Sequence, residues 1–335
     1  MNISYRTRQL IRRITGVTAI VLVAVTVVVL CSVLWLQRFV VYTDEGAKLV
    51  FDQPKKLPQS QLPQTTPLPS VTIAYNDTPF RESLQQLSGY YIDSKSLMDD
   101  PDAVRQKLEQ LPAGTAVLLD VKGYRGYFYY STSVGRNTSS SYNISKMDDL
   151  IRWLAASDLY VIARMSALRD FDLVWNDSSC ALNTTSGVAY YDQGEYGLGY
   201  WLDPTKEKVM HYLTQVIREL RDKGFDEVVL QNFCFPDSDR LAFKGDPAEA
   251  LHNAAEELIT ACSNESFTLS FASSDPHFAL PEGMCRLYLE DIAPENAQSA
   301  WDAATLEEKR LYLVFLALDD DQRYLIENGI LRPLP

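Results

Sequence analysis

An uninterrupted apolar segment near the N-terminus places the strongest constraint on this chain. No charged side chain occurs from residue 14 to residue 37, and residues 17–36 are almost wholly aliphatic. About 20 apolar residues are enough to cross the hydrocarbon core of a bilayer as a helix. We therefore predict a transmembrane anchor at residues 14–37, which leaves the rest of the chain to fold on one side of a membrane.

The charges on the two sides of this segment predict its orientation. Four basic residues precede the span and one follows it: Arg6, Arg8, Arg12, Arg13, and then Arg38. Because cytoplasmic flanks carry the excess of basic residues, we expect residues 1–13 to be a cytoplasmic tail and the C-terminal part to lie outside the cytoplasm. A cleaved signal peptide is the alternative, since it also begins with a basic stretch. The bulky residues at the exit, 33–39, favour an uncleaved anchor.

A proline-rich stretch separates the predicted anchor from the rest of the chain. Residues 52–70 hold five prolines among glutamines and threonines, a composition that prefers extended polyproline-like geometry. We predict a semi-rigid stalk here, with a single large domain at residues 85–335. The segment at 85–335 is of the usual size for one domain.

The charge of the exported part excludes some classes of partner. The chain carries −13, and because residues 1–38 hold five arginines and no acidic residue, the remainder carries −18. An acidic domain repels nucleic acid and anionic lipid, so we expect neither as its ligand, although the anchor itself lies in the membrane. The three histidines do not form a metal set, and no cofactor is predicted. Four cysteines lie beyond the span, and free buried thiols are favoured over two disulfides: Cys180, Cys234, Cys262 and Cys285.

Short apolar runs alternate with helical patterns from residue 88 onward. Seven runs read as buried strands, with a weaker eighth: 89–92, 116–121, 159–163, 227–230, 267–271, 286–289, 311–316 and 329–331. Apolar spacing predicts helices over 209–220 and 251–262, with Asp203-Pro204 and Asp246-Pro247 as their starts. Strands without polar alternation are buried on both faces, which indicates parallel pairing under helices. We predict an α/β fold, a (β/α)8 TIM-type barrel that lacks or replaces its last helix, over a doubly wound open sheet.

Polar residues follow several predicted strands, where the active site of such a barrel lies. They are Asp120, Lys122, Arg164, Gln231, Asn232, Asp275, Glu290 and Asp291. Two carboxylates from different strands, ~5 to ~9 Å apart, are what glycoside cleavage requires. Asp120 with Glu290 or Asp291 are therefore the candidate catalytic pair, and only one of the adjacent Glu290 and Asp291 can point into the barrel.

Structural roles compete with these functional ones. Asp203 is expected to cap its helix, Asp275 to shape a turn before proline, and residues 319–321 to start a solvated helix. Asp120 and Lys122 could pair with each other, since alternate residues of a strand point to the same side. Loop aromatics either stack on sugar rings or cover the barrel mouth: Trp175, Tyr190, Tyr191, Tyr196, Tyr200 and Trp201.

Five segments in order resemble the bacterial putative glycoside hydrolase family, and the similarity runs from about residue 88 to residue 333, most of the predicted exported part. They are Ala116-Val-Leu-Leu-Asp-Val-Lys122, Tyr160-Val-Ile-Ala-Arg164, Trp201-Leu-Asp-Pro204, Gly224-Phe-Asp-Glu227 and Phe235-Pro236. The resemblance implies an exported barrel that acts on, or recognises, polysaccharide. By position, the residues that match those the family keeps are Asp120, Lys122, Arg164, Trp201 and Asp203, which makes Trp201 and Asp203 candidate substrate-binding residues beside those at the strand ends.

The chain departs from the family pattern at the end of the fourth strand. Family members typically read Phe-Asp-Tyr-x-Arg-Phe-Pro there, whereas this chain has Gln231 in place of the aspartate and Cys234 in place of the arginine. The fifth-strand aspartate of the pattern falls on Ala272. An amide carries no charge and is a poor nucleophile or base.

Three functions remain open from the sequence. The first is a membrane-anchored glycosidase acting on cell-envelope polysaccharide or peptidoglycan, and the second is a catalytically impaired barrel that binds glycan or serves as a scaffold. The family resemblance supports the first, and Gln231 with Ala272 supports the second. A purely structural envelope protein is the third, and it predicts no cleft lined by aromatic and acidic side chains.

Overall fold

The computed structural model describes residues 40–43, 46–49, 86–137, 144–194, 197–264, 266–279, 281, 285–306 and 309–335. The predicted tail, anchor and stalk (1–13, 14–37 and 52–70) lie outside the described residues. Within the described part, no helix combines the length and the apolar character that a bilayer crossing needs.

The chain divides into two compact units, Met1–Tyr75 and Asn76–Pro335. In the first, β1 (Val40–Thr43) pairs antiparallel with β2 (Gly46–Leu49). The second unit holds the remaining elements and all the candidate site residues.

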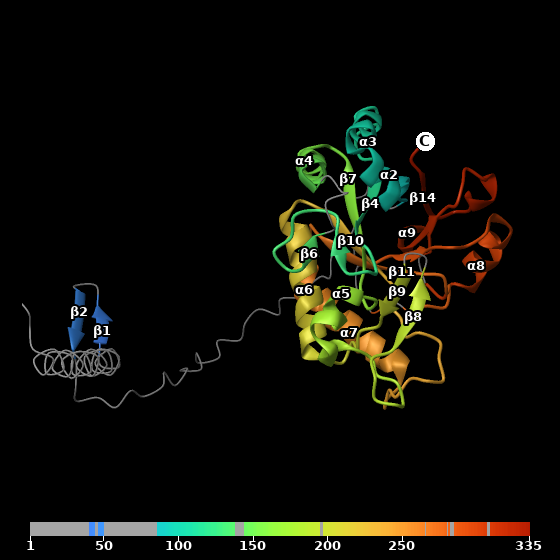
Figure 1. The fold of residues 1–335 in the computed structure, drawn as a ribbon. Helices are drawn as coiled ribbons and strands as arrows, with labels where there is room; N and C mark the ends of the chain where they lie inside the picture. The colour runs from blue at the N-terminus through green and yellow to red at the C-terminus, as the bar shows by residue number, and fades with distance from the viewer. Residues whose placement is uncertain are drawn as a thin grey trace, which may run out of the picture. The chain divides into compact units, whose positions relative to one another are not determined.

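Eight parallel strands of the second unit close into a barrel, as predicted (Figure 1). In order around the barrel they are β3 (Ser88–Ile92), β4 (Ala116–Lys122), β7 (Tyr160–Ser166), β10 (Glu227–Gln231), β11 (Thr268–Ser273), β12 (Leu287–Leu289), β13 (Leu313–Leu316) and β14 (Gly329–Pro333). The pairing of β14 with β3 closes the ring and excludes the open doubly wound sheet.

Side chains alternate between the inside of the barrel and the surrounding helices. Leu118, Ile162, Val229, Tyr288 and Val314 pack together in one buried cluster inside the barrel. The alternate residues of β4, β7 and β10 belong to a larger cluster under the helices, and those of β12 and β13 belong to a separate cluster with α8 and η5. This explains why the strands carry no polar alternation, since both of their faces are buried.

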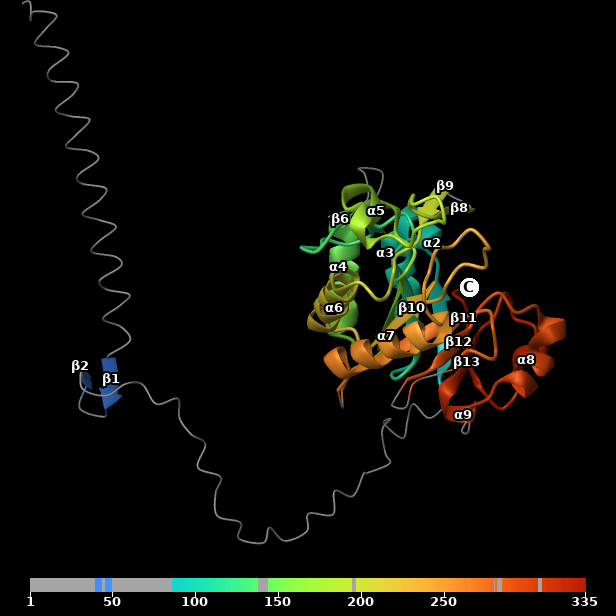
Figure 2. The same ribbon diagram turned by 90° about the horizontal axis from the view of Figure 1, so that it is seen from below.

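Helices cover one half of the barrel more fully than the other (Figure 2). The fuller half carries α2 (Ser94–Asp99), α3 (Pro101–Leu108), α4 (Ile144–Ala155), α5 (Phe171–Asn176), α6 (Glu207–Asp222) and α7 (Pro247–Cys262). The other half carries only α8 (Ala297–Ala303), α9 (Lys309–Tyr312) and the 3-10 turns η4 (Pro294–Asn296) and η5 (Gln322–Tyr324). Residues 309–312 are therefore helical, although the sequence predicted a strand from 311.

The loops between β4 and α6 contain several short strands and a 3-10 turn. They are β5 (Tyr127–Phe128), β6 (Arg136–Asn137), η3 (Ser178–Cys180) and the antiparallel hairpin of β8 (Tyr191–Gly194) and β9 (Gly197–Tyr200). Long loops at the carboxyl ends of barrel strands are where such folds carry their binding residues.

The two predicted helix starts behave differently. Asp246 caps α7 by accepting a hydrogen bond from the backbone N–H of Ala248 at 2.8 Å, as predicted. Asp203 does not cap α6, because a turn follows Pro204 and the helix begins only after Lys206. Asp203 instead accepts hydrogen bonds from the N–H and the hydroxyl of Thr205, at 3.0 and 2.6 Å.

The four cysteines of the barrel unit are free thiols. Cys180, Cys262 and Cys285 are buried, whereas Cys234 is exposed, which the sequence did not predict. Its position directly after β10 puts it at the edge of the site described next.

Candidate active site

Four polar side chains from different strands meet at the carboxyl end of the barrel. Asp120 comes from β4, Arg164 from β7, Gln231 from β10, and Glu290 follows β12. Each continues the inward-facing positions of its strand, one step above the apolar interior. The barrel thus brings into direct contact residues that are 44 to 126 positions apart in the sequence.

Arg164 joins the two carboxylates of this cluster. Its Nε and Nη2 donate to the two oxygens of Asp120 at 2.6 and 3.1 Å. Its Nη1 lies 3.4 Å from Oε2 of Glu290. One guanidinium therefore touches both acids on different edges, which keeps them inside the ~9.5 Å upper limit for paired carboxylates in glycosidases.

Gln231 binds the same oxygen of Glu290 that Arg164 contacts. Its amide nitrogen donates to Oε2 of Glu290 at 2.8 Å. Burial raises the pKa of Glu290, and the nearby Asp291 and Asp120 carboxylates add to this, while Arg164 and the Gln231 hydrogen bond oppose it. A carboxyl group with a raised pKa is suited to donate a proton near neutral pH.

This raised pKa predicts a pH-dependent contribution to stability. A carboxyl whose pKa is higher in the folded state stabilises the fold fully below its unfolded pKa, ~4.3, and loses that contribution as the pH rises through the folded value. We expect the melting temperature of the wild type, relative to Glu290→Gln, to be higher at pH 4 than at pH 7.5. Thermal unfolding of both proteins at the two pH values measures it, and an unchanged or opposite difference contradicts it.

Glu290, not Asp291, points into the barrel. The Glu290 side chain is 14% exposed, whereas Asp291 is exposed and has a left-handed backbone, with φ of 60°. Asn232, directly after β10, also has a positive φ, 54°. Non-glycine residues in this region cost energy and gather at functional sites, so both strand ends here are locally strained around the acid cluster.

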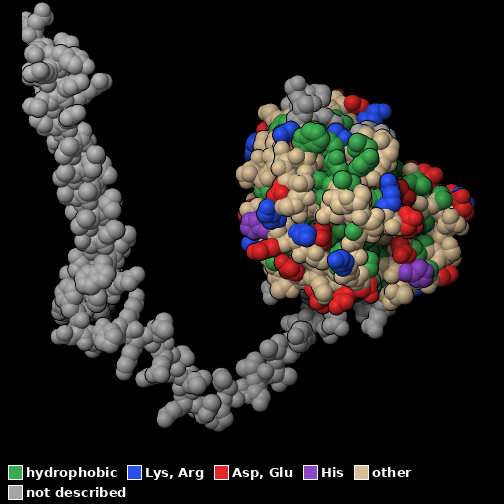
Figure 3. Space-filling model, turned by 60° about the horizontal axis from the view of Figure 1, so that its bottom comes forward, with side chains coloured by type: hydrophobic (Ala, Val, Ile, Leu, Met, Phe, Trp, Pro, Cys, Tyr) green, Lys and Arg blue, Asp and Glu red, His purple; other side chains and the backbone are tan. Residues whose placement is uncertain are grey.

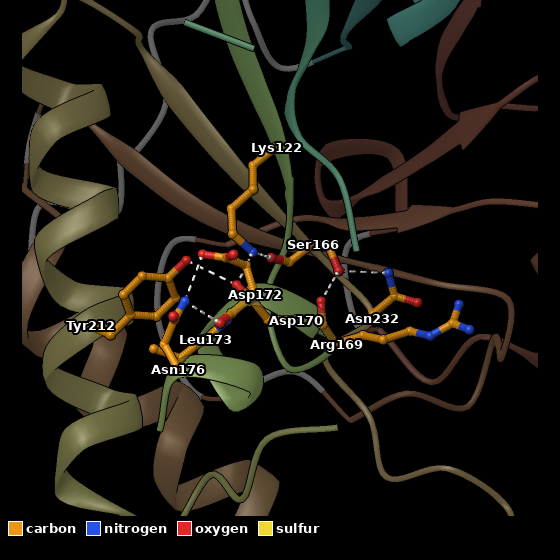
Figure 4. A network of polar contacts seen from close by, with 9 residues as sticks. All are labelled: Lys122, Ser166, Arg169, Asp170, Asp172, Leu173, Asn176, Tyr212 and Asn232. Carbon is orange, nitrogen blue, oxygen red and sulfur yellow. Dashed lines mark hydrogen bonds and ion pairs between the residues drawn. The ribbon is translucent and has the colours of Figure 1, made fainter. Parts of the chain in front are cut away.

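Lys122 does not join this cluster (Figure 4). The register between β4 and β7 shifts between Asp120 and Lys122, so Lys122 lies opposite Met165 and faces the helices rather than the barrel interior. Its ammonium binds Asp170 Oδ2 at 2.8 Å and the Ser166 carbonyl at 2.7 Å, with the side chain fully buried. The alternative in which Asp120 and Lys122 pair with each other is therefore wrong, because Lys122 binds Asp170 and Asp120 binds Arg164.

Asp170 is the centre of this second network. It accepts hydrogen bonds from the Tyr212 hydroxyl at 2.9 Å and the Leu173 N–H at 2.8 Å, in addition to its ion pair with Lys122. Burial and the Asp170 carboxylate raise the pKa of Tyr212 well above its ordinary value. Ser166 links the network to the site, because its hydroxyl accepts from the Asn232 amide at 3.0 Å.

The other predicted substrate-binding residues lie around the cluster rather than in it. Trp201 is buried and donates from Nε1 to Asp192 at 3.0 Å. Asp203 lines a cavity of about 470 Å³ beside the start of α7. Asp275 shapes a turn by accepting from the His277 N–H, and Asp321 caps η5, as the structural interpretations predicted.

Several functional-looking residues were not found from the sequence. Tyr91 of β3 borders the cluster; burial raises the pKa of its hydroxyl and Arg164 opposes the shift. Arg169 binds Asp192 at 2.5 Å, and Glu227 and Arg286 form a buried ion pair inside the barrel. A charged residue within an otherwise apolar strand, as at Glu227, is the one signal that could have identified the last pair.

No metal site is evident in the described part of the chain. Among the residues the structure describes, no group of three or more His, Cys, Asp or Glu side chains could hold an ion.

Comparison with known proteins supports the barrel and its family. A family model described as "Putative glycosyl hydrolase domain" matches residues 90–267. An alpha-galactosidase from Thermus thermophilus, in complex with stachyose, is 12% identical with a TM-score of 0.51; the match covers 74% of this chain and 62% of that one. A GH31 family sulfoquinovosidase from E. rectale is 11% identical with a TM-score of 0.50, over 76% of this chain and 43% of that one.

The likeness to these two enzymes shows the fold alone, and this chain spans less than two thirds of either. A hypothetical protein from Ruminiclostridium thermocellum is 20% identical with a TM-score of 0.46, over 55% of this chain and 96% of that one. No curated protein matches the chain.

Proposed function

Because the chain belongs to the putative glycosyl hydrolase family whose model matches residues 90–267, we propose that its barrel cleaves a glycosidic bond in a polysaccharide outside the cytoplasm. The observation that carries this proposal is the contact of one guanidinium, Arg164, with two carboxylates from different strands. Glycosidases use two such carboxylates on either side of the bond they break.

The two acids have different surroundings, which suits different roles. Glu290 is largely buried with a raised pKa, so it is the proton donor to the leaving oxygen. Asp120 accepts hydrogen bonds from Nε and Nη2 of Arg164 and from the backbone N–H of Ser94 at 3.3 Å. It is therefore the second carboxylate, which faces the anomeric carbon or the water that attacks that carbon. Arg164 holds the two acids apart and stabilises the charge that remains on Glu290 after proton transfer.

The sequence supports a location at the membrane surface. The apolar segment at 14–37 and its basic N-terminal flank favour a membrane anchor with the barrel outside the cytoplasm. The stalk at 52–70 then holds the barrel tens of ångströms from the bilayer, at ~3 Å per residue. Peptidoglycan or another cell-envelope polysaccharide lies within that reach.

A second candidate function is glycan binding without cleavage. Gln231 favours it, because an amide stands where the family has an aspartate, and it touches the proposed acid directly. An aspartate at this position would set a second carboxylate close to Glu290, an arrangement that splits the pKa values of two acids. Without that charge, the site has one acid fewer for chemistry, but the amide still offers a carbonyl acceptor and N–H donors to a sugar.

One assay separates the two functions. The purified full chain is incubated with peptidoglycan and with soluble polysaccharides, and reducing-end release and co-sedimentation are scored independently. We expect the wild type to release reducing ends. Binding without release by the wild type, together with release by Gln231→Asp, would establish the second function instead. Asn232→Asp is the matched control, since it adds the same charge one residue along but faces Ser166.

A further inference from the structure

Four aromatic side chains form a continuous row on α5 and the β8–β9 hairpin. The rings of Phe171 and Trp175 are stacked, with centroids 5.7 Å apart and planes 13° from parallel. Tyr200 packs against Phe171 at 5.4 Å, and Tyr191 meets Tyr200 edge-on at 5.8 Å. We call these four residues the aromatic row.

The row is rigidly supported from below. The guanidinium carbon of Arg125 lies 4.0 Å from the centre of the Phe171 ring, and its Nη1 donates to the Leu198 carbonyl at 2.9 Å. Arg125 therefore connects α5 to the hairpin. Tyr191 and Tyr200 are register partners in the hairpin. Arg169 packs beneath the hairpin, where a Cβ on Gly199 would approach its Nε to 2.5 Å. Glycine therefore lets the hairpin lie directly on the arginine.

The outer faces of the row are open. Trp175 is 69% exposed and Tyr191 is 47% exposed. Single exposed apolar residues are normal on a protein surface, but neighbouring rings held in fixed orientations are typical of binding surfaces. On the face drawn in Figure 3, hydrophobic side chains gather in the upper part while acidic ones dominate the lower edge.

The row continues into the candidate active site. Arg169 binds Asp192 of the same hairpin at 2.5 Å, and its backbone carbonyl accepts from Ser166 at 2.7 Å. The same Ser166 hydroxyl accepts from the amide of Asn232, the residue after Gln231, so a ligand leaving the barrel mouth on this side meets the hairpin.

We propose that the aromatic row is a second glycan-binding site, which holds the polysaccharide chain outside the barrel mouth. The inference rests on the proposed function for the class of ligand. The C–H face of a sugar ring packs against an aromatic face, and Trp175 offers an open one above Phe171. Asp192 and Arg125 flank the row with acceptors and donors for sugar hydroxyls. The acidic charge of the domain disfavours an anionic lipid surface as the occupant.

Affinity electrophoresis and co-sedimentation test the proposal in a variant whose cleavage is removed. The full chain carrying Glu290→Gln is measured against peptidoglycan sacculi, a soluble α-glucan and a soluble β-glucan. We expect at least one to bind, and Trp175→Ala added to this variant to weaken that binding about tenfold or more. Trp175→Tyr, which keeps a ring, retains most of the affinity. Because binding is scored without cleavage, the result is independent of whether the wild type hydrolyses glycan.

A matched control removes an exposed apolar side chain elsewhere. Leu325 is 53% exposed and lies between β13 and β14, so Leu325→Ala leaves the affinity unchanged if the row is the site. The proposal is overturned if no polysaccharide binds, if Trp175→Ala binds as tightly as its parent, or if both alanine variants weaken binding equally.

Discussion

Glu290→Gln is expected to lower the rate of glycan cleavage by ~10²- to ~10⁴-fold, the usual contribution of a positioned general acid. The substitution keeps the size of the side chain and removes the proton that the leaving oxygen needs. Burial raises the pKa of Glu290 and Gln231 donates to it at 2.8 Å, so the carboxyl is both protonatable and fixed in place. The initial rate of reducing-end release, on a polysaccharide that the wild type cleaves, measures the effect.

The neighbouring acid supplies a control with the same change of charge. Asp291→Asn removes a carboxylate one residue along that is exposed and turned away by its left-handed backbone. We expect its cleavage rate to stay within a few-fold of the wild type. An aryl glycoside with an acidic leaving group needs little protonation, so it should restore much of the rate of Glu290→Gln. If Asp291→Asn loses most of its activity while Glu290→Gln keeps full activity, then Asp291 and not Glu290 is the general acid, and our assignment is wrong.

The sequence predicted the fold correctly because short apolar runs, each of the kind that forms a buried strand, repeat along it. Runs such as 116–119 and 228–230 are apolar on both faces, and parallel strands beneath helices bury them in that way. Boundaries were less predictable. Leu311 and Tyr312 end a short helix, although they open the apolar run that predicted a strand from 311. Helix α6 begins at Glu207, four residues after Asp203, because the turn at Pro204 intervenes.

The sequence predicted the site correctly only where side chains alternate regularly along a strand. Asp120, Arg164, Gln231 and Glu290 were expected at the strand ends and do meet there. Lys122 was expected beside Asp120, but an irregularity in pairing turned it to the opposite face. A one-residue shift of this kind reverses the direction of a side chain, and nothing in the local sequence specifies it.

Pairings across the barrel were also out of reach of the sequence. Asp170 and Lys122 are 48 positions apart and come from different strand-end segments, and Arg169 meets Asp192 through a hairpin whose pairing depends on tertiary packing. Local pattern predicts the face on which a residue lies, whereas its partner depends on how the barrel closes.

Arg286→Met is expected to cost ~3 to ~5 kcal/mol of folding free energy, because it leaves a carboxylate buried without its counter-charge. The Arg286 and Glu227 side chains are both fully buried and form an ion pair inside the barrel. Tyr160 and Tyr288 also donate to Glu227, at 2.9 and 3.0 Å, but two hydroxyls do not replace a cation. For a domain of this size we expect the melting temperature to fall by ~6 to ~20 °C, as measured by circular dichroism.

A second variant separates the loss of the ion pair from the loss of packing. Glu227→Gln combined with Arg286→Met removes both charges and keeps a carbonyl that accepts from the two tyrosines. Because desolvating a charge pair offsets most of its attraction, the double variant should be more stable than Arg286→Met alone. Arg152→Met is the surface control: its partner Asp149 is 59% exposed, so the change should cost less than ~1 kcal/mol. If Arg286→Met is as stable as that control, then either Glu227 is protonated in the fold or water reaches it, and the barrel interior is not the dry, charge-pairing core that its burial indicates.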